Sequence, residues 1–65
     1  MAFKNLRAEL ARRNMSIKDL SLVIDMPYPT LARKCAGKTD FTYSEILKIL
    51  KFVNTTFEYL FQQSN

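Results

Sequence analysis

Two prolines, Pro27 and Pro29, divide a 65-residue chain whose remaining segments have the apolar spacing of short helices. Proline carries no N–H, and it disfavours helical backbone at the residue before it. The prolines therefore mark a break between two helices. We expect Tyr28 to be the non-helical residue at the start of the second helix, with Pro29 in the first helical position, where a missing N–H costs little. The alternative is that this helix starts at Pro27 and has both prolines within its first turn.

The segments on either side of the prolines carry start and stop signals of their own. The run Ser16-Ile17-Lys18-Asp19 resembles a capping box, because the serine hydroxyl can accept a free backbone N–H and the aspartate lies near the positive end of the helix. The segment after the prolines runs to about Ala36 and ends at Gly37, since glycine adopts a left-handed backbone freely. The sequence therefore predicts a helix-turn-helix over about 16–37.

Three further helices are expected around this pair. One covers about residues 4–13, one opens with the capping box Thr42-Tyr43-Ser44-Glu45, and one runs from Thr56 to about Gln62. Leu22 and Phe52 fall off the apolar stripes and should be exposed. The fold class is all-α, a compact bundle of five helices in one domain over residues 1–65. The apolar residues on the inner faces form the expected core: Leu6, Leu10, Ile17, Leu20, Val23, Ile24, Leu31, Cys35, Phe41, Ile46, Ile49, Leu50, Val53 and Leu60.

Basic residues gather in the first part of the chain. The net charge is +4 overall, but residues 1–38 carry eight Lys or Arg and three Asp or Glu, a net charge of +5. Residues 39–65 carry a net charge of −1. A one-sided basic charge suits a polyanionic partner such as nucleic acid, although a solvated surface with a mild basic bias gives the same count.

The composition argues against several other classes of protein. Without histidine the usual general base is missing, and no Cys/His cluster or glycine-rich phosphate loop is present, so we expect no enzyme, no metal and no cofactor. The lone Cys35 cannot form an internal disulfide and reads as a small core residue. No apolar run approaches the roughly 18 residues of a membrane span, and the start lacks a signal-peptide core. The expected location is the cytoplasm, with no membrane partner.

The order and spacing of these motifs resembles the lambda-repressor-like (XRE, Cro-type) helix-turn-helix family from Asn5 to Phe61. This sequence departs from that family's pattern where Ile17 replaces a glutamine and Asp25 replaces a glycine in the turn, and its recognition helix lacks the usual glutamine or asparagine. The resemblance is carried by Asn5-Leu6-Arg7-Ala8-Glu9, Ser16-Ile17-Lys18-Asp19-Leu20, Thr30 to Lys38, Phe41 to Ile49, and Phe57-Glu58-Tyr59-Leu60-Phe61.

The resemblance implies a recognition helix that enters the major groove of double-stranded DNA. Arg33 could read a guanine, or could instead serve in an internal salt bridge, and Tyr28 could touch a base or simply pack on Pro29. The residues expected at base edges are Tyr28, Pro29, Ala32 and Arg33. The residues expected at phosphates are Lys18, Thr30, Lys34, Lys38 and Thr39, for each of which an ordinary surface role is the alternative.

The function that follows is that of a Cro-type transcriptional regulator of a phage or prophage in a bacterial host cell, most simply a repressor. Such a protein would bind its operator as a homodimer, at least on DNA, and Phe52, Phe57 and Phe61 are candidates for the two-fold contact. Alternatively, Phe57 and Phe61 cover the bundle. Two other functions stay open: an antirepressor-like module that binds another repressor, favoured by an exposed Leu22, and an antitoxin.

Overall fold

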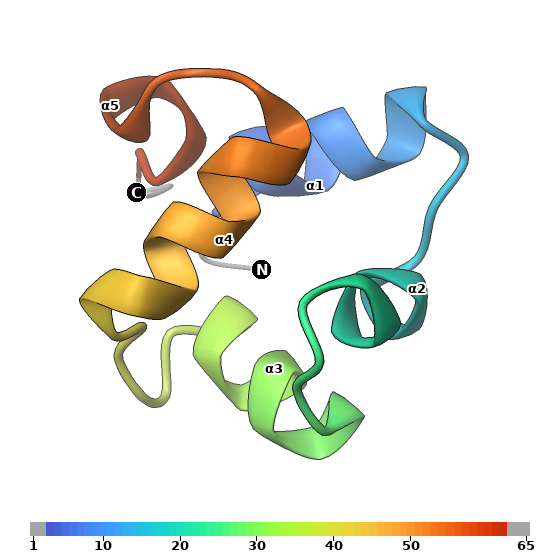
Figure 1. Cartoon of the computed structure of the whole chain (residues 1–65), viewed down its shortest axis with the longest axis vertical. Helices are drawn as coiled ribbons and strands as arrows, with labels where there is room; N and C mark the ends of the chain where they lie inside the picture. Colours follow the sequence, from blue (N-terminus) through green and yellow to red (C-terminus); the bar gives the residue numbers. More distant parts are fainter. Residues whose placement is uncertain (1–2, 63–65) are drawn as a thin grey trace.

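The computed structural model describes residues 3–62, and every regular element in this range is a helix. The elements are α1 (Lys4–Arg12), α2 (Ile17–Val23), α3 (Tyr28–Cys35), α4 (Tyr43–Val53) and α5 (Phe57–Leu60). The expected all-α, five-helix fold is confirmed. In Figure 1, α1 and α5 lie at one end of the molecule and α3 at the other. Helix α2 packs against α3, while α5 packs against both α1 and α4. None of these helices combines the length and the apolar character needed to cross a bilayer.

Both expected capping boxes are present. At the start of α2, the Asp19 N–H donates to Ser16 Oγ (3.1 Å) and the Ser16 N–H donates to Asp19 Oδ2 (2.9 Å). At the start of α4, the Glu45 N–H donates to Thr42 Oγ1 (3.3 Å) and the Thr42 N–H donates to Glu45 Oε1 (2.8 Å). Side-chain caps of this kind contribute about 0.5–2 kcal/mol each, which matters for helices this short.

Left-handed residues follow four of the helices, and Asn54 (φ 62°) is the one after α4. Asn14 (φ 57°), Asp25 (φ 56°) and Gly37 (φ 84°) follow α1, α2 and α3. In each case the next N–H reaches back across the last turn, as when the Lys38 N–H donates to the Arg33 carbonyl (3.0 Å). Asparagine and aspartate tolerate this conformation better than other residues with a side chain. The chain therefore turns sharply after each helix although it has only one glycine.

The expectation that Tyr28 precedes α3 was wrong, and the alternative is the better description. Pro27 occupies the N-cap (φ −57°, ψ 137°), Tyr28 is the first helical residue and Pro29 the second. The first N–H groups of a helix have no partner within it, so a proline in either position removes no hydrogen bond. The Pro27 carbonyl accepts the first helical bond, from the Leu31 N–H at 3.1 Å. Tyr28 thus belongs to α3 itself.

The core is built mainly from leucines. Most of the expected core residues are buried or packed against the core, and Phe3 joins them although it was not expected there. Val23 was assigned to the core wrongly, because 48% of its surface is exposed. At about 100° per residue it lies at the edge of the α2 stripe, well away from Ile24. Leu22 is exposed (76%), as predicted. The fully buried large side chains are Leu6, Leu20, Leu31, Ile49, Leu60 and Val53.

Three phenylalanines close the bundle at the end of α5. The rings of Phe3, Phe41 and Phe61 lie 5.3–5.8 Å apart, centroid to centroid, at tilted or edge-on angles. Such geometry places ring edges against ring faces and adds to the gain from burial. Phe57 stacks on Phe61 at 5.5 Å but stays 49% exposed. Phe61 therefore packs within its own chain, and Phe57 covers it from outside.

A network of polar groups around Glu9 ties α1 to α5. The Tyr59 hydroxyl donates to Glu9 Oε2 (3.1 Å), and the Arg13 guanidinium donates to Glu9 Oε1 (2.9 Å) and to the Val53 carbonyl (2.8 Å). Arg12 pairs with the same carboxylate. The hydrogen bond from Arg13, followed by that from Tyr59, holds the pKa of Glu9 below its ordinary value despite partial desolvation.

Replacing Glu9 by glutamine should make the melting temperature depend less on pH in the acid range. Because the pKa of Glu9 is lowered in the folded chain, its carboxylate stabilises the fold above the unfolded-state pKa, and this contribution is lost as the pH falls through the folded-state pKa. We expect the Tm of the parent chain to fall between about pH 5 and pH 3, and the Tm of E9Q to change less. Thermal melts followed by circular dichroism at a series of pH values measure this. E58Q, on the exposed side of α5, is the control. An equal fall in Tm with falling pH for the parent chain and for E9Q would contradict the role given to the Glu9 carboxylate.

Candidate nucleic-acid interface

Helix α3 has one buried face and one free face. Leu31 (0% exposed) and Cys35 (3%) point into the core. Pro29 and Arg33 are exposed on the other side, and Tyr28, which lies nearer the side of Leu31 and Cys35, is exposed at the first turn. An α-helix with its side chains is about 10–12 Å across, and the major groove of B-DNA is about 12 Å wide, so a helix held by one face can enter the groove with the other. The free face of α3 meets this requirement.

Two of the four residues expected at base edges, Pro29 and Arg33, lie on this free face. Tyr28 is 48% exposed, Pro29 and Arg33 are exposed, and Ala32 is half-buried. Within residues 3–62 the Arg33 side chain makes no hydrogen bond or ion pair, so the internal salt bridge considered as its alternative role is not formed there. The guanidinium carries N–H donors in a rigid fork that matches O6 and N7 of guanine. Tyr28 and Pro29 offer ring surface, and Ala32 a methyl group.

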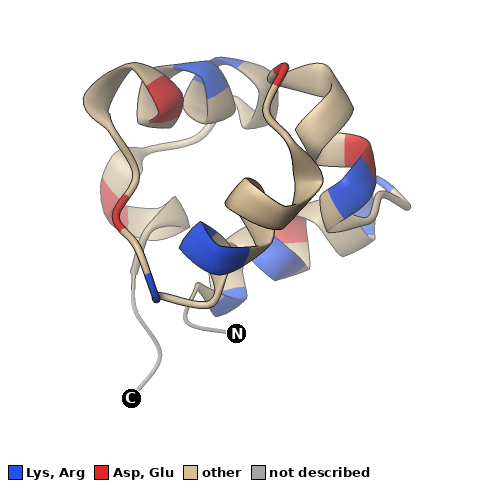
Figure 2. Ribbon diagram, turned by 90° about the horizontal axis from the view of Figure 1, so that it is seen from below, with Lys and Arg blue, Asp and Glu red and all other residues tan. Residues whose placement is uncertain are grey.

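The expected phosphate residues come from three consecutive segments. Lys18 lies in the first turn of α2, Thr30 in the first turn of α3, and Lys38 and Thr39 follow the end of α3. All four residues are exposed. In Figure 2, which views the molecule from the side of α3, basic colour marks the C-terminal part of α3 and the loop after it. Lys18 and Lys38 therefore lie on the segments next to α3 in the chain, while other exposed cations lie on α1 and α4.

Lys34 does not suit the role of a phosphate contact. Its ammonium donates to Glu45 Oε1 (2.7 Å) and to the Asp40 carbonyl (3.1 Å), and its side chain is only 12% exposed. Partial burial raises the pKa of Glu45, but the hydrogen bonds from Lys34 and from the Thr42 N–H outweigh it and leave that pKa lowered. Lys34 thus joins the end of α3 to the start of α4, and its cation is already paired.

Cys35 behaves as a core residue. Burial raises the pKa of its thiol to about 11, because the thiolate would lie in an apolar environment. The thiol therefore stays protonated near neutral pH. Within the described range no group of three or more residues from His, Cys, Asp and Glu is arranged to hold a metal ion.

A family model for the Cro/C1-type HTH DNA-binding domain matches residues 5–62, which is nearly the whole chain. The chain belongs to this family. Helices α2 and α3, with the turn between them, are its helix-turn-helix. Membership supports sequence-specific binding of double-stranded DNA and a role in the regulation of transcription. No match to the chain was found among curated proteins or among solved structures.

Sequence reasoning missed two features of this region. It did not foresee that Lys34 is paired, although the capping box had already placed Glu45 at the start of α4, eleven residues after Lys34. It also assigned the side chain of Val23 to the core, whereas that side chain lies at the surface beside α4. Both depend on how separate helices pack against one another.

Alanine variants of Lys34 and Lys38 should separate a structural cation from a DNA-binding one. We expect K38A to reduce the slope of log K against log salt by about 0.9, the value for one phosphate contact, with little change in Tm. We expect K34A to leave the slope unchanged. It should lower the free energy of unfolding by about 1 kcal/mol, or the Tm by about 4–8 °C, since it removes the ion pair between Lys34 and Glu45. Fluorescence anisotropy with a DNA duplex at several salt concentrations, together with thermal melts, measures both. A reduced slope for K34A, or an unchanged one for K38A, would contradict these assignments.

Proposed function

We propose that this chain is a Cro-type regulator of a phage or prophage, which represses transcription by occupying an operator that overlaps a promoter. The observation that carries the proposal is the exposed, unpaired guanidinium of Arg33 on the free face of α3, with Lys18 and Lys38 on the neighbouring segments. Arg33 is an unpaired cation on the helix whose free face suits the major groove, so it is available to read a base. Lys34, the next residue of α3, is instead held in an ion pair with Glu45.

In the proposed complex α3 lies in the major groove and the flanking cations bind phosphates. Arg33 donates two hydrogen bonds to one guanine, while Tyr28, Pro29 and Ala32 make apolar contacts with thymine methyl groups. Lys18 and Lys38 bind the backbone on either side, and Thr30 and Thr39 add hydroxyl donors. Since phosphate contacts carry no sequence information directly, the base preference rests mainly on Arg33.

We infer that the operator is bound by two copies of the chain, because a single short recognition helix buries little surface. The apolar patch formed by Tyr43, Leu47 and Phe57 supports this inference, since these side chains are 46–75% exposed. The hollow that they line together with Ile46 and Leu50 contains no charged residue, so it can face its own copy without repulsion. Of the three phenylalanines expected in the contact, Phe57 fits best. Phe61 packs inside, and Phe52 lies on another surface.

Replacing Arg33 by alanine should relax the base preference at one position of each half-site. If Arg33 reads a guanine, the loss on the preferred sequence is about 1–3 kcal/mol, and sequences with another base at that position lose little. Selection of bound duplexes from a random library, with the parent chain and with R33A, measures this. R7A, which removes an exposed arginine of α1, is the matched control.

Two results would count against this reading of Arg33 and of the function. Equal weakening of R33A on all sequences would make Arg33 a phosphate contact. If the parent chain bound no duplex at low salt, the chain would act instead through a protein, as an antirepressor-like module or an antitoxin.

Replacing Phe57 by glutamate should weaken self-association, because it puts a charge at the centre of an apolar two-fold contact. We expect F57E to be monomeric in sedimentation at concentrations where the parent chain dimerises on or off its operator, and to bind a two-half-site duplex more weakly. F52E should dimerise normally. If the parent chain sediments only as a monomer at high micromolar concentration and binds the duplex one copy at a time, the dimer is excluded.

A further inference from the structure

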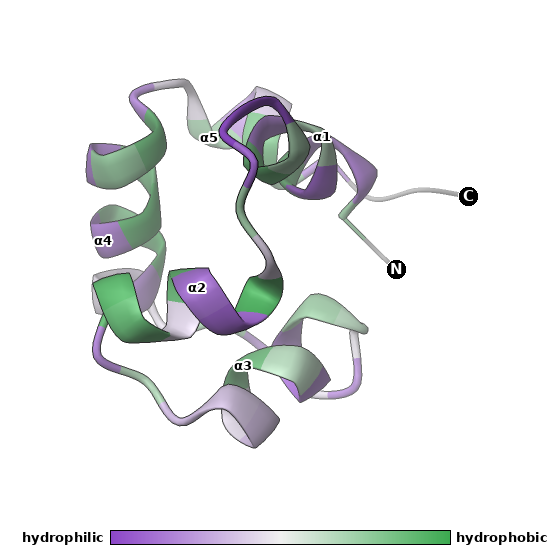
Figure 3. Ribbon diagram, turned by 90° about the vertical axis from the view of Figure 1, so that its right-hand side faces the viewer, coloured by the Kyte–Doolittle hydropathy of each residue, from purple (hydrophilic) through white to green (hydrophobic). Residues whose placement is uncertain are grey.

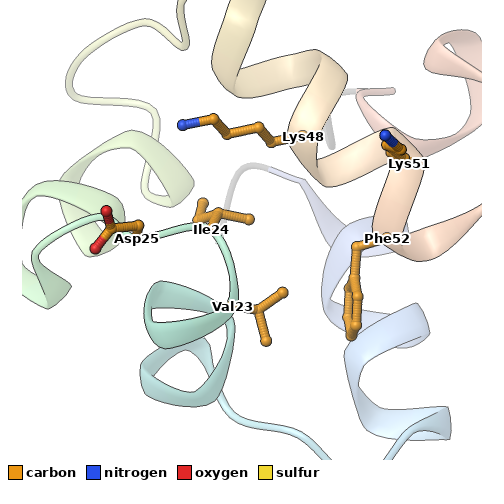
Figure 4. Close-up of a pocket in the computed structure, with 6 residues that line it drawn as sticks. All are labelled: Val23, Ile24, Asp25, Lys48, Lys51 and Phe52. Atoms are coloured by element: carbon orange, nitrogen blue, oxygen red, sulfur yellow. The ribbon is translucent and has the colours of Figure 1, made fainter.

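A groove lies between the end of α2 and the outer side of α4. Its floor and one wall are formed by Val23, Ile24 and Phe52, and its other wall by Lys48 and Lys51 of α4, while Asp25 closes the end near the turn (Figure 4). No residue of α3 lines it. The groove is therefore a surface separate from the proposed DNA contact, and nothing in the proposed function uses it.

The groove exposes apolar surface that the fold does not need. Val23 is 48% exposed and Phe52 37%, and next to them Leu22 is 76% exposed. Figure 3 shows the apolar colour at the C-terminal turn of α2, beside α4. A second hollow on α4 is lined by the same two lysines with Leu47 and Leu50, but these leucines also line the proposed two-fold contact, so the groove is confined to Val23, Ile24 and Phe52 with the lysines. Exposed apolar side chains that line one groove can be covered by the apolar face of another molecule.

The charge of the groove specifies the kind of molecule. Lys48 and Lys51 are three residues apart on one helix, so their side chains lie one above the other on the same face. Both are exposed, and neither makes an ion pair within residues 3–62. The carboxylates of Glu9 and Glu45 are paired elsewhere, and that of Asp19 caps α2. Asp25, which closes the groove near the turn, makes no ion pair with either lysine within residues 3–62, so both ammonium groups are available to carboxylates of another molecule.

We propose that this groove binds an acidic amphipathic helix of a partner protein. Its apolar side chains would cover Val23 and Phe52, and carboxylates spaced three or four residues apart would face Lys48 and Lys51. A second copy of this chain fits poorly, because a two-fold contact would bring two such lysine pairs together. A DNA backbone would satisfy the lysines but would leave the apolar floor exposed to water. Since α3 is not involved, the same molecule can hold DNA and this partner together.

A pair of designed peptides tests the proposal on the full chain. One is a helix with leucines along one face and glutamates beside them, and its twin carries lysine in place of each glutamate. We expect the acidic peptide to shift the NMR signals of Val23, Ile24 and Phe52 in the ¹⁵N-labelled chain, and to bind K48E/K51E about tenfold or more weakly, since two attractive charge contacts become repulsive. The lysine peptide should bind K48E/K51E better than the parent chain. K4E/R7E, with the same spacing on α1, should bind the acidic peptide as the parent does.

Each competing occupant gives a different result, and each overturns the proposal. If the signals that shift lie on α3, or if the two peptides bind the parent chain equally well, the groove does not recognise acidic helices. If K48E/K51E loses affinity for a DNA duplex beyond the loss seen for K4E/R7E, the lysines are phosphate contacts. If K48E/K51E instead changes the oligomeric state in sedimentation, the groove faces a second copy. The proposal is supported if K48E/K51E binds DNA as K4E/R7E does and prefers the lysine peptide to the acidic one. This result does not depend on whether the operator model is correct.

Discussion

The anchoring of α3 by Leu31 and Cys35 is the constraint on which the rest of this molecule depends. A helix of eight residues is not stable by itself in water, because nucleating it costs more than its few hydrogen bonds return. These two side chains are almost fully buried and hold the helix from one side. The opposite face then needs no packing partner and can carry residues chosen for contact with DNA. The fold and the function therefore share one short helix without competing for the same side chains.

The ends of the helices make such a small bundle possible. Each short helix leaves unpaired backbone groups at both ends, and these would be costly if they stayed unsatisfied. Hydroxyl caps at Ser16, Thr42 and Thr56 satisfy the starts of α2, α4 and α5. Left-handed residues at Asn14, Asp25 and Gly37 satisfy the ends of the first three helices. These local bonds also set the direction in which α3 leaves the turn, and so the direction in which its free face points.

The basic residues of the chain fall into two groups with different roles. Arg13 and Lys34 are paired with Glu9 and Glu45, and they join helices: Arg13 also reaches the Val53 carbonyl at the end of α4, and Lys34 joins α3 to α4. Within residues 3–62 the cations that make no ion pair lie at the surface, near α3, on α4 and at the start of α1. A net charge of +4 cannot distinguish these groups. Binding depends on which cations remain unpaired after the ion pairs within the fold have formed.

The sequence by itself determined the local structure: the prolines, the capping boxes and Gly37 predict where helices begin and end, since those signals act within four or five residues. The family resemblance likewise rested on motif order and spacing. Tertiary structure alone decided which side chains stay available. The distance between Lys34 and Glu45, the packing of Phe61 on Phe3 and the exposure of Val23 beside α4 all depend on how separate helices meet. No local pattern encodes them, because each is set by the packing of side chains from different parts of the bundle.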